Sequence, residues 1–353
     1  MCADGSLERY RARWVVRGFR QRAGVDSGEM FSPVVKPATI CTVLTIAASR
    51  QWLVHQLDVK NAFLHGVLSE EVSCLQPAGF VNASMPDHVC RLAKSLYGLK
   101  QAPCAWFLRF AGFIKTIGFT ATRSNSSLFT MVCGADVAFL LLYVDDIVLM
   151  ASSPALLQRI VCQLTGEFAM KDMGTLHFFL GIRVTRIAAG FFMCQQQYTE
   201  EVLERAGLDT CRPSPTPIDT KGKLQSRQSG PNLVKWVLHY VHGTPDPGLH
   251  LRAWPNLDHC AFTDADWAGC PDKRRSTSGF CVYLGDSCLV VFQPPSDYVQ
   301  LLGDLLAPVT KATLVFCDNV SVVYLSANPN HHRHTKHVEL DIHFRVLHIP
   351  TAQ

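Results

Sequence analysis

The stretch Ala138-Phe139-Leu140-Leu141-Leu142-Tyr143-Val144-Asp145-Asp146-Ile147-Val148-Leu149-Met150 places two adjacent carboxylates inside an otherwise apolar, strand-like run. A buried charge without a partner costs a large share of a domain's net stability. Two short strands joined by a tight turn would carry both carboxylates at a hairpin tip, where a divalent cation with oxygen ligands, typically Mg²⁺, can bind them. The alternative is a surface turn with two solvated aspartates, since Asp is a favoured turn residue. Other motifs in the chain favour the metal site.

The composition is that of a globular protein with a sizeable core. The chain has 353 residues, enough for two or three domains, and 48% of them are hydrophobic. No apolar stretch reaches the roughly 20 residues needed to span a bilayer, and the polar, Arg-rich N-terminus does not look like a secretory signal. The 14 cysteines are scattered without C-x-x-C pairs. We therefore expect reduced thiols and a protein that is neither secreted nor embedded in a membrane.

Positive charge is concentrated at the N-terminus. The formal net charge is only +4, but the first 22 residues carry six arginines against two acids, namely Arg9, Arg11, Arg13, Arg17, Arg20 and Arg22 against Asp4 and Glu8. Such a bias points to a polyanionic partner, and the alternative is a solvated edge strand.

Periodicity gives a coarse map of the elements. Helices are expected at 40–49, 92–115, 154–168, 198–206, 233–241 and 298–306, and strands at 54–59, within 176–196, within 260–291 and at 313–316. The polar, proline-containing stretch from Cys211 to Pro231 is the best linker candidate.

Asp58 ends the predicted strand at 54–59. Alone it would be an ordinary strand-end aspartate, given the turn preference of Asp. Together with Asp145 and Asp146 it provides a third carboxylate, as a site for two divalent cations requires. Such a pair of cations can clamp the attacking and leaving oxygens of a phosphoryl transfer.

Several further motifs accompany these acids in a fixed order. They are Arg11-Ala12-Arg13-Trp14-Val15-Val16-Arg17-Gly18-Phe19, Phe31-Ser32-Pro33-Val34-Val35, the Asp58 block His55-Gln56-Leu57-Asp58-Val59-Lys60-Asn61-Ala62-Phe63, Ser95-Leu96-Tyr97-Gly98-Leu99-Lys100-Gln101-Ala102-Pro103, Tyr143-Val144-Asp145-Asp146 and Phe179-Leu180-Gly181-Ile182. In this order and spacing the chain resembles, over residues 4–217, the polymerase region of Ty1/copia-type retrotransposon polyproteins. Coinciding motifs are far more specific than any single one.

The resemblance implies an α+β right-hand polymerase with fingers, palm and a reduced thumb. Asp58, Asp145 and Asp146 match the family's metal-binding carboxylates, which would hold two Mg²⁺ ions, with Mn²⁺ as an alternative. The implied partners are an RNA template, a DNA primer and dNTP substrates. The implied location is intracellular, in a cytoplasmic virus-like particle or in the nucleus.

The resemblance also assigns residues around the nucleotide. Phe63 matches the bulky residue that excludes a 2′-OH, and Gln101 matches a residue that contacts nucleotide and template. Lys171 would balance or protonate the leaving pyrophosphate, and Arg11, Arg13 and Arg17 would contact template or triphosphate oxygens. Phe179, Leu180 and Gly181 resemble a hairpin that grips the primer, in which Gly permits close backbone approach. The alternatives are a core aromatic for Phe63, a buried amide for Gln101 and a surface lysine for Lys171.

A second constellation resembles the family's ribonuclease H domain, which acts on RNA–DNA hybrids. Asp264, Asp318 and Glu339 fit three of the four carboxylates of that fold. The fourth is a helical Glu, but this chain has no Glu between Glu204 and Glu339, and Asp304 is a poor substitute. We expect the activity to be lost, and apolar residues of the uncovered strands to be exposed, among them Phe280, Val282, Val290 and Phe292. The clustered histidines at 331–337 favour a basic or exposed loop over a zinc site, because no cysteine pairs with them.

The expected organisation has three parts. Residues 1–210 would form the fingers and palm, 211–255 a linker with a truncated thumb and connection, and 256–353 an incomplete ribonuclease H-like α/β domain. The family carries a long segment between Gln225 and Leu233 that is reduced here to a few residues. Three hypotheses stay open: an RNA-directed DNA polymerase, a non-catalytic remnant that binds nucleic acid, and, disfavoured by Phe63 and Gln101, another two-metal nucleotidyl enzyme.

Overall fold

The computed structural model describes residues 14–22, 24, 32–217, 231–244, 248–254, 258–265, 278–289, 295–307 and 314–317. Of the predicted site residues, Arg11, Arg13, Asp318 and Glu339 lie outside these ranges, as does the His-rich stretch. The side chain of Asp264 is likewise not described.

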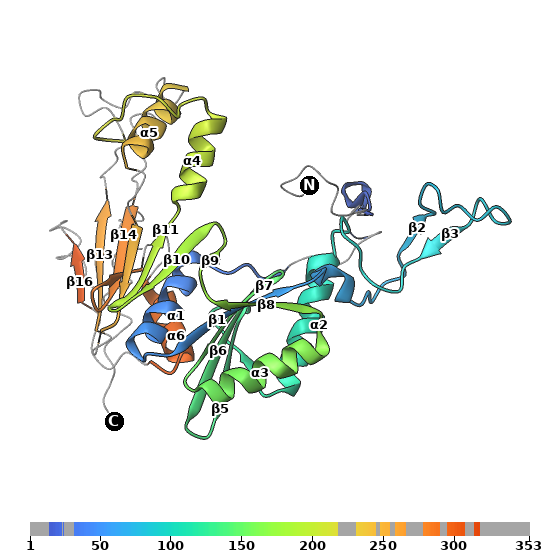
Figure 1. Cartoon of the computed structure of the whole chain (residues 1–353), viewed down its shortest axis with the longest axis horizontal. Coiled ribbons are helices and arrows are strands. Elements are labelled where there is room, and N and C mark those ends of the chain that lie inside the picture. The colour runs from blue at the N-terminus through green and yellow to red at the C-terminus, as the bar shows by residue number, and fades with distance from the viewer. Residues whose placement is uncertain are drawn as a thin grey trace, which may run out of the picture.

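A six-stranded antiparallel sheet forms the centre of the molecule (Figure 1). Its strand order is β4 (Thr120–Ala121), β5 (Leu128–Cys133), β6 (Asp136–Tyr143), β7 (Asp146–Ala151), β1 (Leu53–Val59) and β8 (Met170–Thr175). The predicted hairpin is thus β6–β7, and β1 inserts between β7 and β8 from far earlier in the chain. This insertion brings Asp58 to the end of the hairpin.

Both faces of the central sheet are covered, which explains why β6 and β7 are almost continuously apolar. Leu140 and Leu149 pack with α2 (Ala102–Thr116) and α3 (Pro154–Glu167) on one side. Phe139 and Met150 point to the other side, where α1 (Pro37–Ser49) lies. Because successive side chains of a strand alternate between faces, a strand between two layers must be apolar on both.

A second antiparallel sheet lies on the α1 side of the central sheet (Figure 1). Its order is β12 (Gly248–Arg252), β11 (Gly190–Cys194), β10 (Ile182–Ile187) and β9 (Phe178–Phe179). Helix α4 (Gln196–Arg205) follows β11 and packs with α5 (Pro231–Gly243). Strand β12 returns to the body by pairing with β11 along five residues.

The polypeptide around residues 92–101 differs from its prediction. The helix expected at 92–115 begins only at Ala102, and the preceding residues form an irregular segment against the N-terminal stretch. Gly98 has φ +93°, a left-handed conformation that no helix allows, and the Val16 amide donates to the Tyr97 carbonyl at 2.8 Å. Nearby lie the short helices η1 (Gly18–Arg20) and η2 (Ala62–His65) and the projecting hairpin of β2 (Ser73–Leu75) and β3 (Val89–Arg91) (Figure 1).

The described part of the C-terminal third contains a four-stranded sheet and one helix. The sheet order is β15 (Ser287–Cys288), β14 (Ser278–Leu284), β13 (His259–Ala265) and β16 (Leu314–Cys317), with β16 parallel to β13. Helix α6 (Pro295–Asp304) covers one face through Leu301 and Leu302, so Val282 is fully buried. The expectation that Val282 would be exposed was therefore wrong, while the side chains of Phe280, Val290 and Phe292 lie outside the described residues.

The mixture of helices and antiparallel strands confirms an α+β chain. Among the residues that the structure describes, none of the helices has the length and apolar character needed to traverse a bilayer.

Candidate active site

Three side chains form a row across the central sheet at its β6–β7 tip. Asp58 on β1 lies opposite Asp146 on β7 and opposite Lys171 on β8. Directly opposed residues of antiparallel strands share a face, with Cβ atoms about 4.5–5.5 Å apart. The row Asp146–Asp58–Lys171 therefore stands on one face, which is the face that also carries α1.

The turn of the β6–β7 hairpin carries the remaining acid, Asp145. Val144 has φ +54°, an unfavourable conformation for a β-branched residue. Two contacts hold this turn: the Trp106 indole donates to the Val144 carbonyl at 2.6 Å, and the Val59 amide donates to the Asp145 carbonyl at 2.8 Å. Strain at this turn is maintained by surrounding structure, a pattern typical of functional sites.

Electrostatics at Asp146 fit a cation site. Burial raises the pKa of Asp146 above its usual range, and the charges of Asp145 and Asp58 raise it further, while a hydrogen bond from Gln56 opposes the shift. The Gln56 amide lies 3.5 Å from the Asp146 carboxylate. Gathering three carboxylates here is unfavourable in the absence of positive charge, and a divalent cation would remove that penalty.

The donor set also suits the ion that was predicted. Carboxylate oxygens are the ligands that Mg²⁺ prefers. In the side-chain conformations of the described ranges, however, no three or more His, Cys, Asp or Glu residues are grouped as a metal site. The backbone thus brings Asp58, Asp145 and Asp146 to one end of the sheet, and their carboxylates would have to turn towards a shared ion.

Phe63 and Gln101 lie beside the irregular segment that precedes α2. The ring of Phe63 packs on Tyr97 with centroids 4.9 Å apart, and both rings are half-buried. Phe63 also lines a small cavity with Trp106, Phe107 and Val144, directly behind the hairpin turn.

Gln101 is 3% exposed, and only one of the two polar groups of its side-chain amide has a hydrogen-bond partner. Its carbonyl oxygen accepts from the Gln21 amide at 2.9 Å, while its own Nε2 has no hydrogen-bond partner. A buried amide donor without a partner is costly, so this position favours a ligand that supplies an acceptor.

The predicted primer-gripping residues have different surroundings. Phe179 is 2% exposed and belongs to the core beside α1. Leu180 and Gly181 form the turn between β9 and β10, both with positive φ, and nothing lies within 4 Å of a Cβ built on Gly181. Only the turn is thus open to a partner. The side chain of Arg17 is exposed just before η1.

The acids of the C-terminal third are only partly described. Asp264 lies near the end of β13, opposite Gly279 of β14. Asp304, the one helical acid considered as a replacement ligand, accepts hydrogen bonds from the Ser124 amide at 3.0 Å and the Ser124 hydroxyl at 2.7 Å. Its carboxylate is therefore bound to the loop before β5.

Sequence reasoning missed the residues that support the predicted site residues. Gln56 contacts Asp146, and Gln21 contacts Gln101. Trp106 holds the turn next to Asp145 through the Val144 carbonyl, and His55 pairs with Asp172 next to Lys171. The sequence did contain a signal for Gln56. It stands two residues before Asp58 on a predicted strand, so the two side chains must lie on the same face of the sheet.

Comparison with known families identifies the family of the chain. Residues 3–220 match the family model described as reverse transcriptase (RNA-dependent DNA polymerase). Because the match covers more than half of the chain, the protein belongs to this family.

Its curated relatives include Pol polyproteins of copia-type retrotransposons. The chain is 36% identical to the retrovirus-related Pol polyprotein from transposon RE2 of Arabidopsis thaliana, covering 99% of this chain and 29% of the relative. It is 31% identical to that from transposon TNT 1-94 of Nicotiana tabacum, covering 97% and 31%. A putative transposon Ty5-1 protein of Saccharomyces cerevisiae is 32% identical over 46% of the chain and 53% of the relative.

The chain thus spans about 30% of the length of the first two relatives. The alignment with RE2 runs over 426 positions against 353 residues here, so at least 73 positions of the relative have no counterpart. This shortfall agrees with the deletions expected from the sequence.

Proposed function

We propose that this chain is an RNA-directed DNA polymerase that extends a DNA primer on an RNA template. The row Asp146–Asp58–Lys171, with Asp145 at the adjoining turn, carries the proposal because it gathers acids and one base at the end of a covered sheet. Family membership supports the same reaction class.

In this mechanism Asp58, Asp145 and Asp146 would hold two divalent cations, Mg²⁺ or Mn²⁺, which supply positive charge at the attacking and leaving oxygens of nucleotidyl transfer. Lys171, opposite Asp58, would balance charge or give a proton at the leaving pyrophosphate. The Leu180–Gly181 turn, which ends the core strand that contains Phe179, would support the primer.

Other residues would bind and select the nucleotide. Phe63 would exclude a 2′-OH by its volume, and the unpartnered Nε2 of Gln101 would donate to nucleotide or template. Arg17, with Arg11 and Arg13 of the same motif, would contact phosphate oxygens. In this proposal residues 1–210 are the fingers and palm, and 211–255 a shortened thumb and connection.

Primer extension with the full chain tests the proposal. Purified protein, an RNA template, a labelled DNA primer, dNTPs and Mg²⁺ should give extended product, and Asp58→Asn or Asp145→Asn should reduce extension to background. Asp209→Asn, at an exposed site after α4, is the matched control. Failure of wild type under both Mg²⁺ and Mn²⁺, or full activity of Asp58→Asn, would contradict the proposal.

The alignment shortfall favours a second candidate, nucleic-acid binding without synthesis. Binding to a primer–template should then weaken with salt at a log–log slope of about 0.7–0.9 per phosphate neutralised. Neutralising Arg11, Arg13 and Arg17 should flatten that slope. Salt-independent binding would remove this candidate.

A further inference from the structure

A β-bulge decides which residue faces Asp58. Along β8 the partner of Asp58 is Lys171 and that of Leu57 is Asp172, but Gln56 pairs with Gly174 and His55 with Thr175. Met173 is therefore an extra residue without a partner on β1. Without the bulge, the register at His55 would run on unbroken, so that Met173 would pair with Leu57 and Asp172 with Asp58.

That difference changes the charge beside the proposed metal site. With the bulge, a lysine stands across from Asp58 on the same face. With a regular ladder, a like charge would stand there, which is destabilising. A one-residue slip also turns every following side chain to the other face of the sheet.

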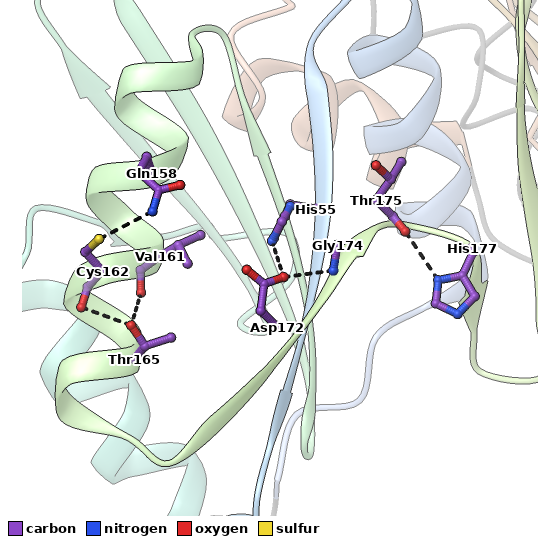
Figure 2. Close-up of polar contacts among 9 residues, drawn as sticks. All are labelled: His55, Gln158, Val161, Cys162, Thr165, Asp172, Gly174, Thr175 and His177. Atoms are coloured by element: carbon purple, nitrogen blue, oxygen red, sulfur yellow. Dashed lines mark hydrogen bonds and ion pairs between the residues drawn. The ribbon is translucent and has the colours of Figure 1, made fainter.

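The side chain of Asp172 fastens the bulge at two points (Figure 2). Its Oδ1 accepts from the Gly174 amide at 2.8 Å, which spans Met173, and lies 2.7 Å from Nε2 of His55 on β1. Gly174 supplies the left-handed conformation, with φ +75°. Asp172 thus ties the extra residue of β8 to its own strand and to the neighbouring strand.

This pair lies on the face opposite the acids. Leu57 and His55 share a face because they are two residues apart, and Leu57 packs into the core with α2 and α3. Figure 2 shows His55 and Asp172 on the side where α3 runs. The pair therefore acts through the sheet and needs no contact with substrate.

We propose that His55 and Asp172 are positioning residues that lock the β8 bulge and so keep Lys171 opposite Asp58. The inference rests on the proposed polymerase function for its catalytic consequence, but not for its structural one. The alternative is a solvent-exposed pair of little energetic value, since the side chain of Asp172 is 52% exposed and that of His55 20%.

Hydrogen exchange in the full chain tests the structural step. Asp172→Ala, and to a smaller extent His55→Ala, should speed exchange of the Met170–Thr175 amides by about tenfold or more. Asp172→Asn keeps the accepting oxygen and should restore protection. His177→Ala is the matched control, because the ring of this exposed histidine meets the Thr175 carbonyl at 3.3 Å and no bulge residue (Figure 2). Unchanged exchange in Asp172→Ala would overturn the proposal.

Kinetics test the catalytic step. Asp172→Ala should lower kcat for primer extension by about 10- to 100-fold with little change in KM for dNTP, and Asp172→Asn should recover most of it. In a Lys171→Ala background, Asp172→Ala should cost almost nothing more, because both act through one side chain. Fully additive losses would overturn the positioning role. If wild type extends no primer, the proposed function fails, and hydrogen exchange alone decides whether the bulge is locked as inferred.

Discussion

At the scale of single residues, the ionised carboxylate of Asp146 lowers the stability of the fold at the candidate active site. It is half-buried, and burial together with Asp145 and Asp58 raises its pKa. A folded-state pKa above the unfolded value means that folding is favoured while the group is protonated. This contribution is lost as the pH rises through the raised pKa.

Asp146→Asn should therefore raise the melting temperature at neutral pH while reducing primer extension to background. The amide has no charge to desolvate, and the two neighbouring acids lose a repulsive partner. The measurement is thermal unfolding of both forms between about pH 4 and pH 8. This range runs from the ordinary pKa of a carboxyl group to neutral pH and above. Added Mg²⁺ should stabilise wild type more than the variant. A variant less stable than wild type at neutral pH would contradict this account of the site.

Phe63 offers a second test at this scale. Phe63→Val should admit ribonucleotides, lowering discrimination between dNTPs and rNTPs at least about tenfold, because the proposed role would place the removed ring volume beside the sugar. Phe107→Val is the matched control, since it removes the same volume from the same cavity wall. Primer extension with each nucleotide type measures the ratio. If both variants discriminate equally well between dNTPs and rNTPs, Phe63 is a packing residue and does not select the sugar.

At the scale of elements, the backbone of the N-terminal stretch around Val16 crosses the backbone around Gly98 in direct contact. This crossing lies next to Phe63 and Gln101. A Cβ on Gly98 would lie 1.9 Å from the Val16 carbonyl oxygen, and one on Gly18 would lie 1.8 Å from the Gly98 carbonyl oxygen. The crossing requires glycine at both positions, because any side chain there would clash. It holds the N-terminal stretch against the segment that leads into α2.

Gly98→Ala should destabilise this crossing beyond the cost of its left-handed backbone. Gly118→Ala isolates that cost, because Gly118 has φ +104° but only the Met131 side chain nearby, at 3.6 Å. The control should lose about 1–2 kcal/mol, and Gly98→Ala clearly more, with faster tryptic cleavage after the exposed Arg17 and Arg20. Urea unfolding and limited proteolysis measure the two effects. Equal losses of unfolding free energy in the two variants would mean that the two backbones can move apart at the crossing without further cost.

The sequence predicted elements whose signal is local and missed features that depend on distant pairing. The β6–β7 hairpin and α3 follow from apolar periodicity, and α3 begins where Ser153 caps it. Residues 92–101 looked helical because Leu96 and Leu99 fit a helical period, but Gly98 and the contact with Val16 override it. The β8 bulge and the pairing of β12 with β11 involve partners far apart in sequence, which no local pattern encodes.

At the scale of the whole molecule, the C-terminal third is attached to the body at several points. β12 extends the second sheet, Arg50 donates to the Leu306 carbonyl at 2.7 Å, and Ser124 donates to Asp304. Leu301 and Leu305 of this region belong to the same buried cluster as α1. A shortened chain can thus retain a joined fold even though a segment of its relatives is missing.

The Asp304–Ser124 contact should contribute measurably to this attachment. In a double-mutant cycle, Asp304→Ala and Ser124→Ala should show a coupling of about 0.5–3 kcal/mol, because both variants lose the hydrogen bond from the Ser124 hydroxyl. Asp286→Ala, in the exposed turn after β14, is the control and should show no coupling with Ser124→Ala. Urea unfolding provides the free energies. Additive effects of Asp304→Ala and Ser124→Ala would show that the hydrogen bond from the Ser124 hydroxyl contributes nothing in solution.

The same contact bears on ribonuclease H activity. β13 and β16 are adjacent and parallel, Thr263 lies opposite Cys317, and Asp318 directly follows Cys317 in the sequence. With Asp264 and Glu339, Asp318 would supply three of the four acids that the family resemblance implies. Asp304 would have to supply the last, but its carboxylate accepts two hydrogen bonds from Ser124.

We therefore expect no cleavage of an RNA–DNA hybrid by this chain. Removing one ligand from a two-metal site weakens cation binding and misplaces the attacking water. A labelled hybrid incubated with the full chain and Mg²⁺ or Mn²⁺ should stay intact, while an active ribonuclease H added to the same mixture should cut it. Ser124→Ala removes the hydroxyl hydrogen bond to the Asp304 carboxylate and keeps the one from the backbone amide. This variant should still give no cleavage, because α6 is held through its leucines. Cleavage that disappears in Asp264→Asn would show that another acid has filled the vacant position, and loss of that cleavage in Asp304→Asn would identify it.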